Sequence, residues 1–191
     1  MLDMKLNNLL SERKSTILKR WFDSVMETYP AETSVFYKKH NKPFTNPVGS
    51  TIFHGLEGLF DEILKKKDFE TPSPFLDSII RIRAIQDFTP AQALVFVFII
   101  KKVILEELKS EIMEHRLFDE LLAIESRIDD LAVQAFDIYM KYREKLYELR
   151  VKELQNLTFR QLQVADRIYK KKHDQKYSGS DVAERKGAII Q

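Results

Sequence analysis

The chain has 191 residues, of which 44% are hydrophobic, and this length allows one substantial core. Cysteine is absent, which excludes disulfide bonds, thiolate metal centres and a cysteine nucleophile. The net charge of +2 is unevenly spread, because residues 141–176 carry 11 Lys or Arg against five acids while residues 177–191 are balanced. Residues 1–140 therefore carry a net charge of −4. An acidic body followed by a basic segment indicates an arm that faces a partner, although a solvated helix with many Glu–Lys pairs has the same composition.

The first predicted helix covers residues 6–29, where apolar residues that include Trp21 recur with helical spacing. We expect it to end at Tyr29, because the residue before a proline is disfavoured in the α region. Residues 31–48 contain two further prolines and are predicted to be irregular.

A second helix is predicted over residues 50–66. Gly55 and Gly58 lie three residues apart on it and would let a neighbouring helix approach closely. A third helix is predicted over residues 75–88.

The fourth helix has the clearest start signal in the chain. Thr89, Pro90 and Gln92 form a capping box with proline at the first helical position. Residues 94–100 are apolar at every position, so this helix is predicted to have no solvent face and to lie at the centre of the core. The apolar run ends at Lys101 after seven residues, which is too short to cross a membrane.

Residues 117–172 contain neither glycine nor proline, and their apolar residues keep a helical spacing. Unbroken, a helix over them would be about 80 Å long, so its first half is expected in the core and its second half is expected to project. We therefore predict a core over residues 5–140, a basic helical arm over 141–176 and a disordered tail over 177–191.

The predicted arm carries a narrow apolar seam, a pattern typical of self-pairing or docking. We predict a homodimer, formed through the arm or the last core helix. The candidate partner-binding residues are Tyr142, Leu146, Leu149, Leu154 and Leu157.

Three blocks of sequence carry a resemblance to a known family: WFDSVMETYP (21–30), KPFTNPVGSTIFHGLEGLFDEI (42–63) and RIRAIQDFTPAQALVFVFIIKKVI (81–104). Together they resemble the N-terminal domain of the RsbRD proteins, co-antagonists of the kinase RsbT. The resemblance implies a globin-like sensory domain that binds no haem in its best-known members and usually precedes a phosphorylatable STAS domain in the stressosome. Only some 50 helical residues follow the core here, against about 100 of alternating strand and helix for a STAS domain, so we expect a stand-alone module.

Two arginines mark a candidate ligand site. Arg81 and Arg83 are two residues apart on an apolar helix and point about 200° apart, so one is expected to face the interior, where a guanidinium needs a carboxylate or carbonyl. Asp87, four residues after Arg83, is the nearest candidate partner. One interpretation is a structural clamp between the third and fourth helices. The other is an anionic effector held by Arg81 with the help of Gln86.

Several aromatic residues either line a ligand cavity or belong to a plain core: Trp21, Phe75, Phe88, Phe96 and Phe98. The fourth helix, with Phe96, is where an amphipathic ligand is first expected, beside the arginines.

The histidines do not predict a metal or haem site. His54 with Glu57, and Glu111 with His115, lack the spacing of a di-iron bundle, and neither histidine is marked as a haem ligand. We therefore predict no metal and no cofactor. No phosphate-binding glycine loop or Ser-His-Asp set is present, so we predict no enzyme. Acids interrupt the basic arm throughout, so nucleic acid is not a predicted partner.

The sequence thus favours an all-α, globin-like helical bundle with a long C-terminal extension. Its predicted function is that of a non-enzymatic, cytoplasmic stress-response sensor that relays a signal to a regulatory protein, either a kinase or a STAS-type protein. The alternative is a structural adaptor or assembly factor that binds a subunit of a redox or membrane respiratory complex, and a haem- or ligand-binding globin is third. No signal peptide is evident.

Overall fold

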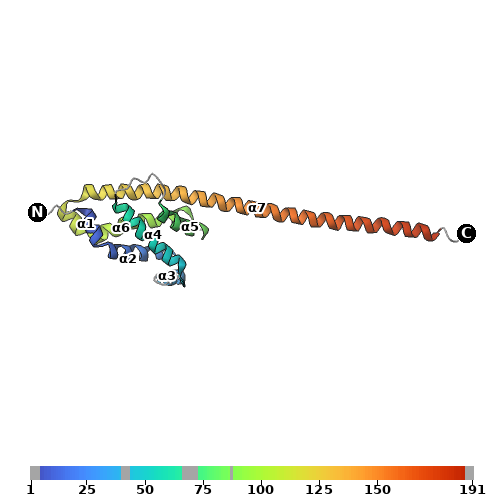
Figure 1. Ribbon diagram of the computed structural model, residues 1–191, viewed down its shortest axis with the longest axis horizontal. Coiled ribbons are helices and arrows are strands. Elements are labelled where there is room, and N and C mark those ends of the chain that lie inside the picture. Colours follow the sequence, from blue (N-terminus) through green and yellow to red (C-terminus); the bar gives the residue numbers. More distant parts are fainter. Residues whose placement is uncertain (1–4, 40–43, 66–72, 87, 188–191) are drawn as a thin grey trace. The chain divides into compact units, whose positions relative to one another are not determined.

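The computed structural model describes the backbone of residues 5–39, 44–65, 73–86 and 88–187, and the side chains of these residues up to 171. Over these residues the regular structure is entirely α-helical, which confirms the predicted all-α fold with a long C-terminal helix (Figure 1). The helices in chain order are α1 Leu6–Glu12, α2 Lys14–Met26, α3 Ala31–Tyr37, α4 Pro47–Leu64, α5 Pro74–Ile85, α6 Pro90–His115 and α7 Phe118–Gly187. The chain divides into two compact units, Met1–Glu144 and Lys145–Gln191.

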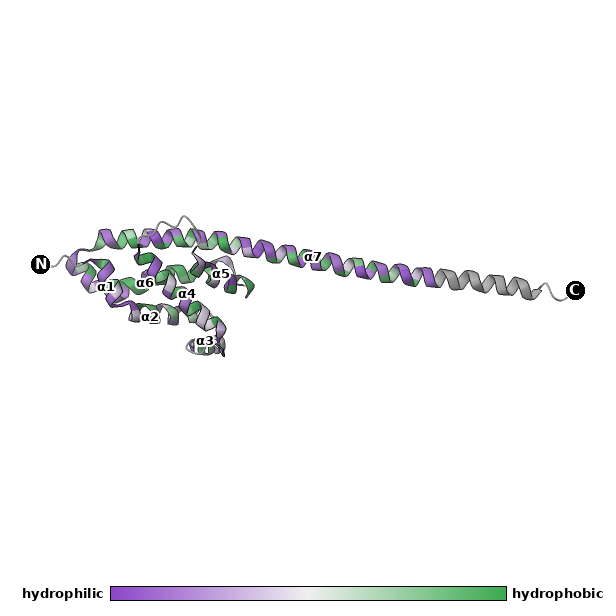
Figure 2. Ribbon diagram, in the orientation of Figure 1, coloured by the Kyte–Doolittle hydropathy of each residue, from purple (hydrophilic) through white to green (hydrophobic). Residues whose placement is uncertain are grey.

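The core of the first unit is built from two helix pairs, α2 with α6 and α4 with α5. Trp21 is buried between α2 and α6, and its indole Nε1 donates a hydrogen bond of 2.8 Å to the carbonyl of Phe96. The part of α7 within this unit adds buried residues at helical spacing, namely Ile124, Ile128, Leu131, Ala135 and Ile138. Figure 2 shows the corresponding alternation of apolar and polar residues along α7.

Helices α4 and α5 approach closely at two glycines, as predicted. A Cβ atom on Gly55 would lie 2.7 Å from Cγ1 of Ile79, and one on Gly58 would lie 2.4 Å from Cδ1 of Phe75. Both distances are shorter than carbon atoms tolerate, so the two helices can be this near only because no side chain lies between them.

The start of α6 is as predicted. Thr89 Oγ1 accepts from the amide of Gln92, and the Gln92 side chain accepts from the amide of Thr89 at 3.0 Å, which completes the capping box. Helix α4 starts earlier than predicted, because Asn46 caps it and Pro47 takes the first position.

The first predicted helix is interrupted, and the predicted irregular stretch contains another helix. Arg13 has φ −94° and ψ 8°, outside the helical region, and it separates α1 from α2. Helix α2 ends at Met26, three residues before the predicted end at Tyr29. Pro30 precedes α3, because its fixed φ of −54° suits the residue before a helix. The prediction of an irregular segment over 31–48 was therefore wrong at α3.

The apolar run of α6 is not covered on every side. Phe96 and Ile100 are buried, whereas 46% of Phe98 is exposed, so the prediction of a helix without a solvent face was wrong at this residue. The reason is geometric: successive residues point 100° apart, and the helices packed on α6 in this unit cover only part of its circumference.

Helix α7 continues to Gly187, so residues 177–187, predicted as part of a disordered tail, extend the helix instead. Residues 177–187 contain no proline, the residue that most strongly interrupts a helix.

The turn between α6 and α7 places Arg116 in the left-handed region, at φ 53° and ψ 43°. The amide of Leu117 donates to the carbonyl of Ile112 at 3.1 Å, the closure of a helix end that usually uses glycine. We expect Arg116→Gly to raise the free energy of unfolding by about 1 kcal/mol, because glycine adopts this conformation without steric cost. Urea unfolding followed by circular dichroism measures the change.

The matched control is Lys109→Gly, at an exposed interior position of the same helix. There glycine should lower the free energy of unfolding by about 1 kcal/mol. Equal losses at both positions would contradict the left-handed assignment of Arg116.

Candidate functional site

The candidate site is centred on Arg83 of α5, whose side chain is fully buried, at 0% exposure. Three aromatic rings surround its guanidinium. The distances from Cζ to the ring centroids are 5.1 Å for Tyr29, 4.6 Å for Phe88 and 5.7 Å for Phe96. These distances are those of cation–π contacts, which are strongest where water is excluded.

Hydrogen bonding satisfies only part of this guanidinium. Nη2 donates to Thr28 Oγ1 at 2.6 Å and to the carbonyl of Gln92 at 3.1 Å. Nε and Nη1 are buried and have no hydrogen-bond partner among the residues that the structure describes. Burial lowers the pKa of Arg83, an effect that the nearby phenol of Tyr29 opposes, and burial raises the pKa of Tyr29. The site is thus a buried cation with unused donors.

An open pocket of about 590 Å³ lies next to this cation. Its lining residues are Thr28, Tyr29, Pro30, Thr33, Tyr37, Gln86, Phe88 and Gln92. Four of the eight (Thr28, Tyr29, Phe88 and Gln92) also contact Arg83, so the guanidinium lies directly behind the pocket wall.

The pocket wall is held by packed rings and by two polar contacts. Tyr29 packs edge-on against Tyr37 and Phe88, with ring centroids 5.3 and 5.1 Å apart. The Tyr29 hydroxyl donates to Gln86 Oε1 at 3.2 Å, and Gln86 Nε2 donates to the Tyr37 hydroxyl at 3.3 Å. Side chains from the α2–α3 connection, α3 and the α5–α6 connection therefore meet at this wall.

The end of α7 that belongs to the first unit is bonded to the elements of the site. Tyr139 donates to the carbonyl of Phe88 at 2.6 Å, and Tyr142 donates to the carboxylate of Asp77 at 3.0 Å. Arg143 adds a longer contact of 3.5 Å to the carbonyl of Ala84. Three residues within one turn of α7 thus hold α5 and the α5–α6 connection.

Comparison with protein families gives a match for residues 15–154 to the family described as the RsbT co-antagonist protein rsbRD N-terminal domain. The chain belongs to this family. The predicted resemblance is therefore confirmed, and with it a regulatory, sensor-type role in stress-response signalling. The family gives no support to the alternative of a respiratory assembly factor. No curated protein and no solved structure matches the chain, so the globin-like comparison stays a prediction.

For this family member, three of the five predicted ligand-site residues lie together: Arg83 and Phe96 in the buried cluster, and Gln86 on the pocket wall. Arg81 is exposed and lies near Tyr142. Burial raises the pKa of Tyr142, and the charge of Arg81 opposes this effect without cancelling it. The arginine that faces the interior is thus Arg83, and the structure places it, in contrast to Arg81, at the pocket. Asp87 lies outside the described residues.

The predicted aromatic set does not form one cavity. Trp21 and Phe96 are buried and Phe88 is half-buried, whereas Phe75 and Phe98 are exposed. The ring of Phe75 lies over Gly58 on α4.

Sequence reasoning missed the residues that come from the ends of α2 and α3, above all Tyr29 and Tyr37. Tyr29 was interpreted only as a helix stop before Pro30, and the α3 that carries Tyr37 was not predicted. The signal that could have found them is the cluster of Thr28, Tyr29 and Tyr37 around a proline, where side chains at helix ends converge.

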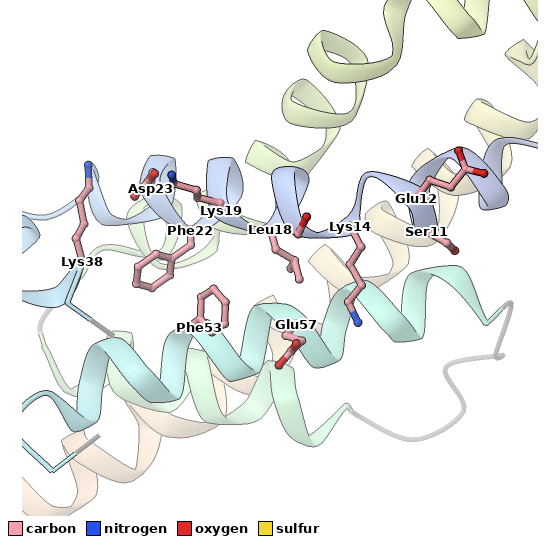
Figure 3. Close-up of a pocket in the computed structure, with 11 residues that line it drawn as sticks. Ser11, Glu12, Lys14, Leu18, Lys19, Phe22, Asp23, Lys38, Phe53 and Glu57 are labelled. Carbon is pink, nitrogen blue, oxygen red and sulfur yellow. The ribbon is translucent and has the colours of Figure 1, made fainter. Parts of the chain in front are cut away.

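A second pocket, of about 670 Å³, lies between the N-terminal helices and α4 (Figure 3). Figure 3 shows Phe22 and Phe53 facing each other in it, with their ring centroids 5.4 Å apart. Its rim mixes both signs of charge, and Lys14 is paired with Asp61 at 2.6 Å. The mixed rim does not select a ligand charge, which distinguishes this pocket from the one at Arg83.

Neither His54 nor His115 lines either of these two pockets. His54 and His115 are exposed, and His54 pairs weakly with Glu57 at 3.5 Å. No group of three potential metal ligands occurs among the described residues. Over the same residues, no helix is long and apolar enough to span a membrane.

The predicted partner-binding residues differ in their surroundings. Tyr142 is half-buried and bonded to Asp77 within the first unit. In the second unit Leu149, Leu154 and Leu157 are exposed. Because Leu149 and Leu154 are five residues apart on one helix, they point about 140° apart and do not share a face.

Proposed function

We propose that this protein is a regulatory module that senses a signal at the Arg83 pocket and relays it through α7 to a regulatory protein of kinase or STAS type. The family supports the regulatory part of this proposal. The observation that carries the relay is the double role of Phe88. Its ring stacks on the Arg83 guanidinium, and its carbonyl accepts the hydrogen bond from Tyr139 on α7.

The relay follows from these two contacts. An event at the pocket that shifts Phe88 as a whole, ring and backbone together, changes the Tyr139 hydrogen bond. Tyr142 and Arg143 tie the next positions of α7 to α5, so the change is imposed on a rigid helix and not on a loop. Beyond its last buried residues, the end of a helix held by a few polar contacts can occupy two positions of similar free energy, and a signal need only shift their populations.

Hydrogen exchange tests the relay in the isolated chain. We expect Arg83→Met to change the exchange of amides 139–144, because it removes the group on which Phe88 stacks. In a background that carries Tyr139→Phe, the effect of Arg83→Met on these amides should fall, because the link is already broken. The control is Arg20→Met. Arg20 is partly exposed and pairs with Glu106 and Glu107, not with the residues around Arg83. Unchanged exchange in α7 on Arg83→Met would contradict the relay.

We further propose that the second unit pairs with a second copy of the chain. Its residues Leu154, Leu157, Gln161, Val164 and Ile168 follow the 3–4 spacing of a coiled-coil seam. The four apolar members are about half exposed or more, and a shallow apolar groove follows the same face from Leu157 to Ile168. An isolated helix has little stability of its own, because most helical stability comes from packing of an apolar face. Packing of this face against the same helix of a second copy supplies that stability.

Sedimentation velocity at micromolar concentration tests this pairing. We expect a dimer for the unaltered chain and a monomer for Leu154→Glu/Leu157→Glu, because two charges then face each other across the seam. The control Asn156→Glu/Gln163→Glu adds the same charge on the opposite side of the helix, about 120° or more from the centre of the seam, and should stay dimeric. A monomer for the unaltered chain would overturn the proposed dimer but not the relay.

A further inference from the structure

The charge of Arg83 has no counter-charge among the residues that the structure describes. Its guanidinium is fully buried, its contacts are to rings, a hydroxyl and a carbonyl, and two of its nitrogen atoms have no acceptor. A buried cation of this kind is stabilised most by a carboxylate placed against its free donors. Such a group can come from a ligand in the neighbouring pocket.

We propose that the Arg83 pocket binds a small organic monocarboxylate with an apolar body. This assignment names the signal of the module proposed above, and for its regulatory meaning it rests on that proposal. The carboxylate takes the free donors of Arg83, and the body lies in the pocket.

The ligand carries one negative charge because the site supplies one positive charge. The eight residues that line the pocket include no Lys, Arg or His, so Arg83 behind the wall is its only cation among the described residues. A phosphate dianion would leave a second charge in a site without a second cation, which costs more than it gains.

The apolar body follows from the walls. The rings of Tyr29, Tyr37 and Pro30 supply an apolar lining that does not depend on Phe88, and the volume of about 590 Å³ holds an aryl or short branched chain. The polar groups at the rim, on Thr33 and Gln86, suit a hydroxyl or carbonyl on that body without requiring one.

The carboxylate reaches Arg83 when the ring of Phe88 turns outward. Phe88 is only half-buried, and its ring is the nearest of the three to the guanidinium, at 4.6 Å. The carboxylate then replaces a cation–π contact by charge-assisted hydrogen bonds, which are stronger. Because the Phe88 carbonyl is bonded to Tyr139, a shift of the Phe88 backbone on binding is passed to α7.

Thermal unfolding and isothermal titration of the full chain, with benzoate as the probe, test the proposal. Benzyl alcohol has the same body without the charge, and inorganic phosphate is an anion without the apolar body. We expect benzoate to raise the melting temperature and the other two to have no effect. The matched variants are Arg83→Met and Arg81→Met, which remove neighbouring arginines of the same helix. Benzoate should bind at least about ten-fold more weakly to Arg83→Met and with unchanged affinity to Arg81→Met.

Two further variants keep the proposal falsifiable if Arg83→Met does not fold. Phe88→Ala opens the path to Arg83 and should bind benzoate more tightly than the unaltered chain. Asp87→Asn should leave benzoate binding unchanged. Benzoate binding seen only after Asp87→Asn would assign the counter-charge to that aspartate and overturn the proposal.

Equal shifts with benzyl alcohol or phosphate, or no shift with benzoate, would also overturn it. Those results leave the exchange experiment on Tyr139 unaffected, so a wrong ligand class and a wrong relay are distinguishable.

Discussion

Arg83→Met is expected to make the protein more stable, by about 1–3 kcal/mol in the free energy of unfolding, because replacing a buried ion with a well-packed apolar side chain removes its desolvation cost. Nε and Nη1 gain nothing from burial, since neither has an acceptor. The groups that Arg83 does bond do not become isolated. Thr28 Oγ1 still donates to the carbonyl of Val25 at 2.7 Å, and the carbonyl of Gln92 keeps its place in α6. Methionine is unbranched and can fill the space between the three rings. Urea unfolding at neutral pH measures the gain.

Arg81→Met is the control for this stability measurement as well, and it should stay within about 0.5 kcal/mol because Arg81 is exposed. A loss of about 3 kcal/mol or more for Arg83→Met would have a different meaning. It would show that the guanidinium has a strong internal partner and serves as the structural clamp between α5 and α6. The sign of one free-energy change therefore separates the two interpretations that the sequence left open.

If a residue lowers the free energy of unfolding at its position, its presence there is explained by something other than folding. Proteins commonly break local rules at sites of function and make up the loss elsewhere. Arg83 breaks two of them, since it buries a charge without a carboxylate and leaves donors unused. The three rings around the guanidinium lessen this cost but do not remove it. The N–H groups of a guanidinium lie in its plane, and a ring stacked on its face does not accept hydrogen bonds from them. We therefore expect Arg83 to serve binding and not folding.

The sequence predicted that one of two arginines faces the interior, but not which one. Helical spacing fixes the angle between Arg81 and Arg83, whereas the choice depends on where α5 rests against its neighbours. That placement is a tertiary property. It is set in part by Gly55 and Gly58, which bring α4 against one face of α5.

Local signals were the ones that predicted structure well. The Thr89 capping box involves residues three apart, so it could be predicted without knowledge of the fold, and α6 begins where it indicated. Helix α3 was missed because seven residues between prolines carry no periodicity, and the pocket wall that needs Tyr37 was missed with it. The Arg83 cage draws on the α2–α3 connection, α5, α6 and the α5–α6 connection, and side chains from such distant segments could not be assembled from spacing alone.

Gly55→Val is expected to lower the free energy of unfolding by about 2 kcal/mol, because it overpacks the contact between α4 and α5. Even the first added carbon would lie 2.7 Å from Cγ1 and 2.8 Å from Cδ1 of Ile79. Ile79 is fully buried and cannot turn away, and the carbonyl of Phe75 lies at 3.4 Å on the other side. Valine is a better helix former than glycine, but that gain is about 0.5 kcal/mol and does not offset the clash. Thermal and urea unfolding measure the loss.

Gly58→Val is the matched comparison, at the same interface and on the same helix. Its Cβ atom would come even closer to a neighbour, 2.4 Å from the ring of Phe75, so distance alone predicts the larger loss there. Phe75 is 39% exposed, however, and its ring can rotate into solvent at little cost. We therefore expect Gly58→Val to change the free energy of unfolding by less than about 1 kcal/mol, because the gain in helix propensity opposes the lost ring contact. If the two variants lose equal stability, then the freedom of the neighbour to move is not what decides the cost, and the α4–α5 contact is rigid at both glycines.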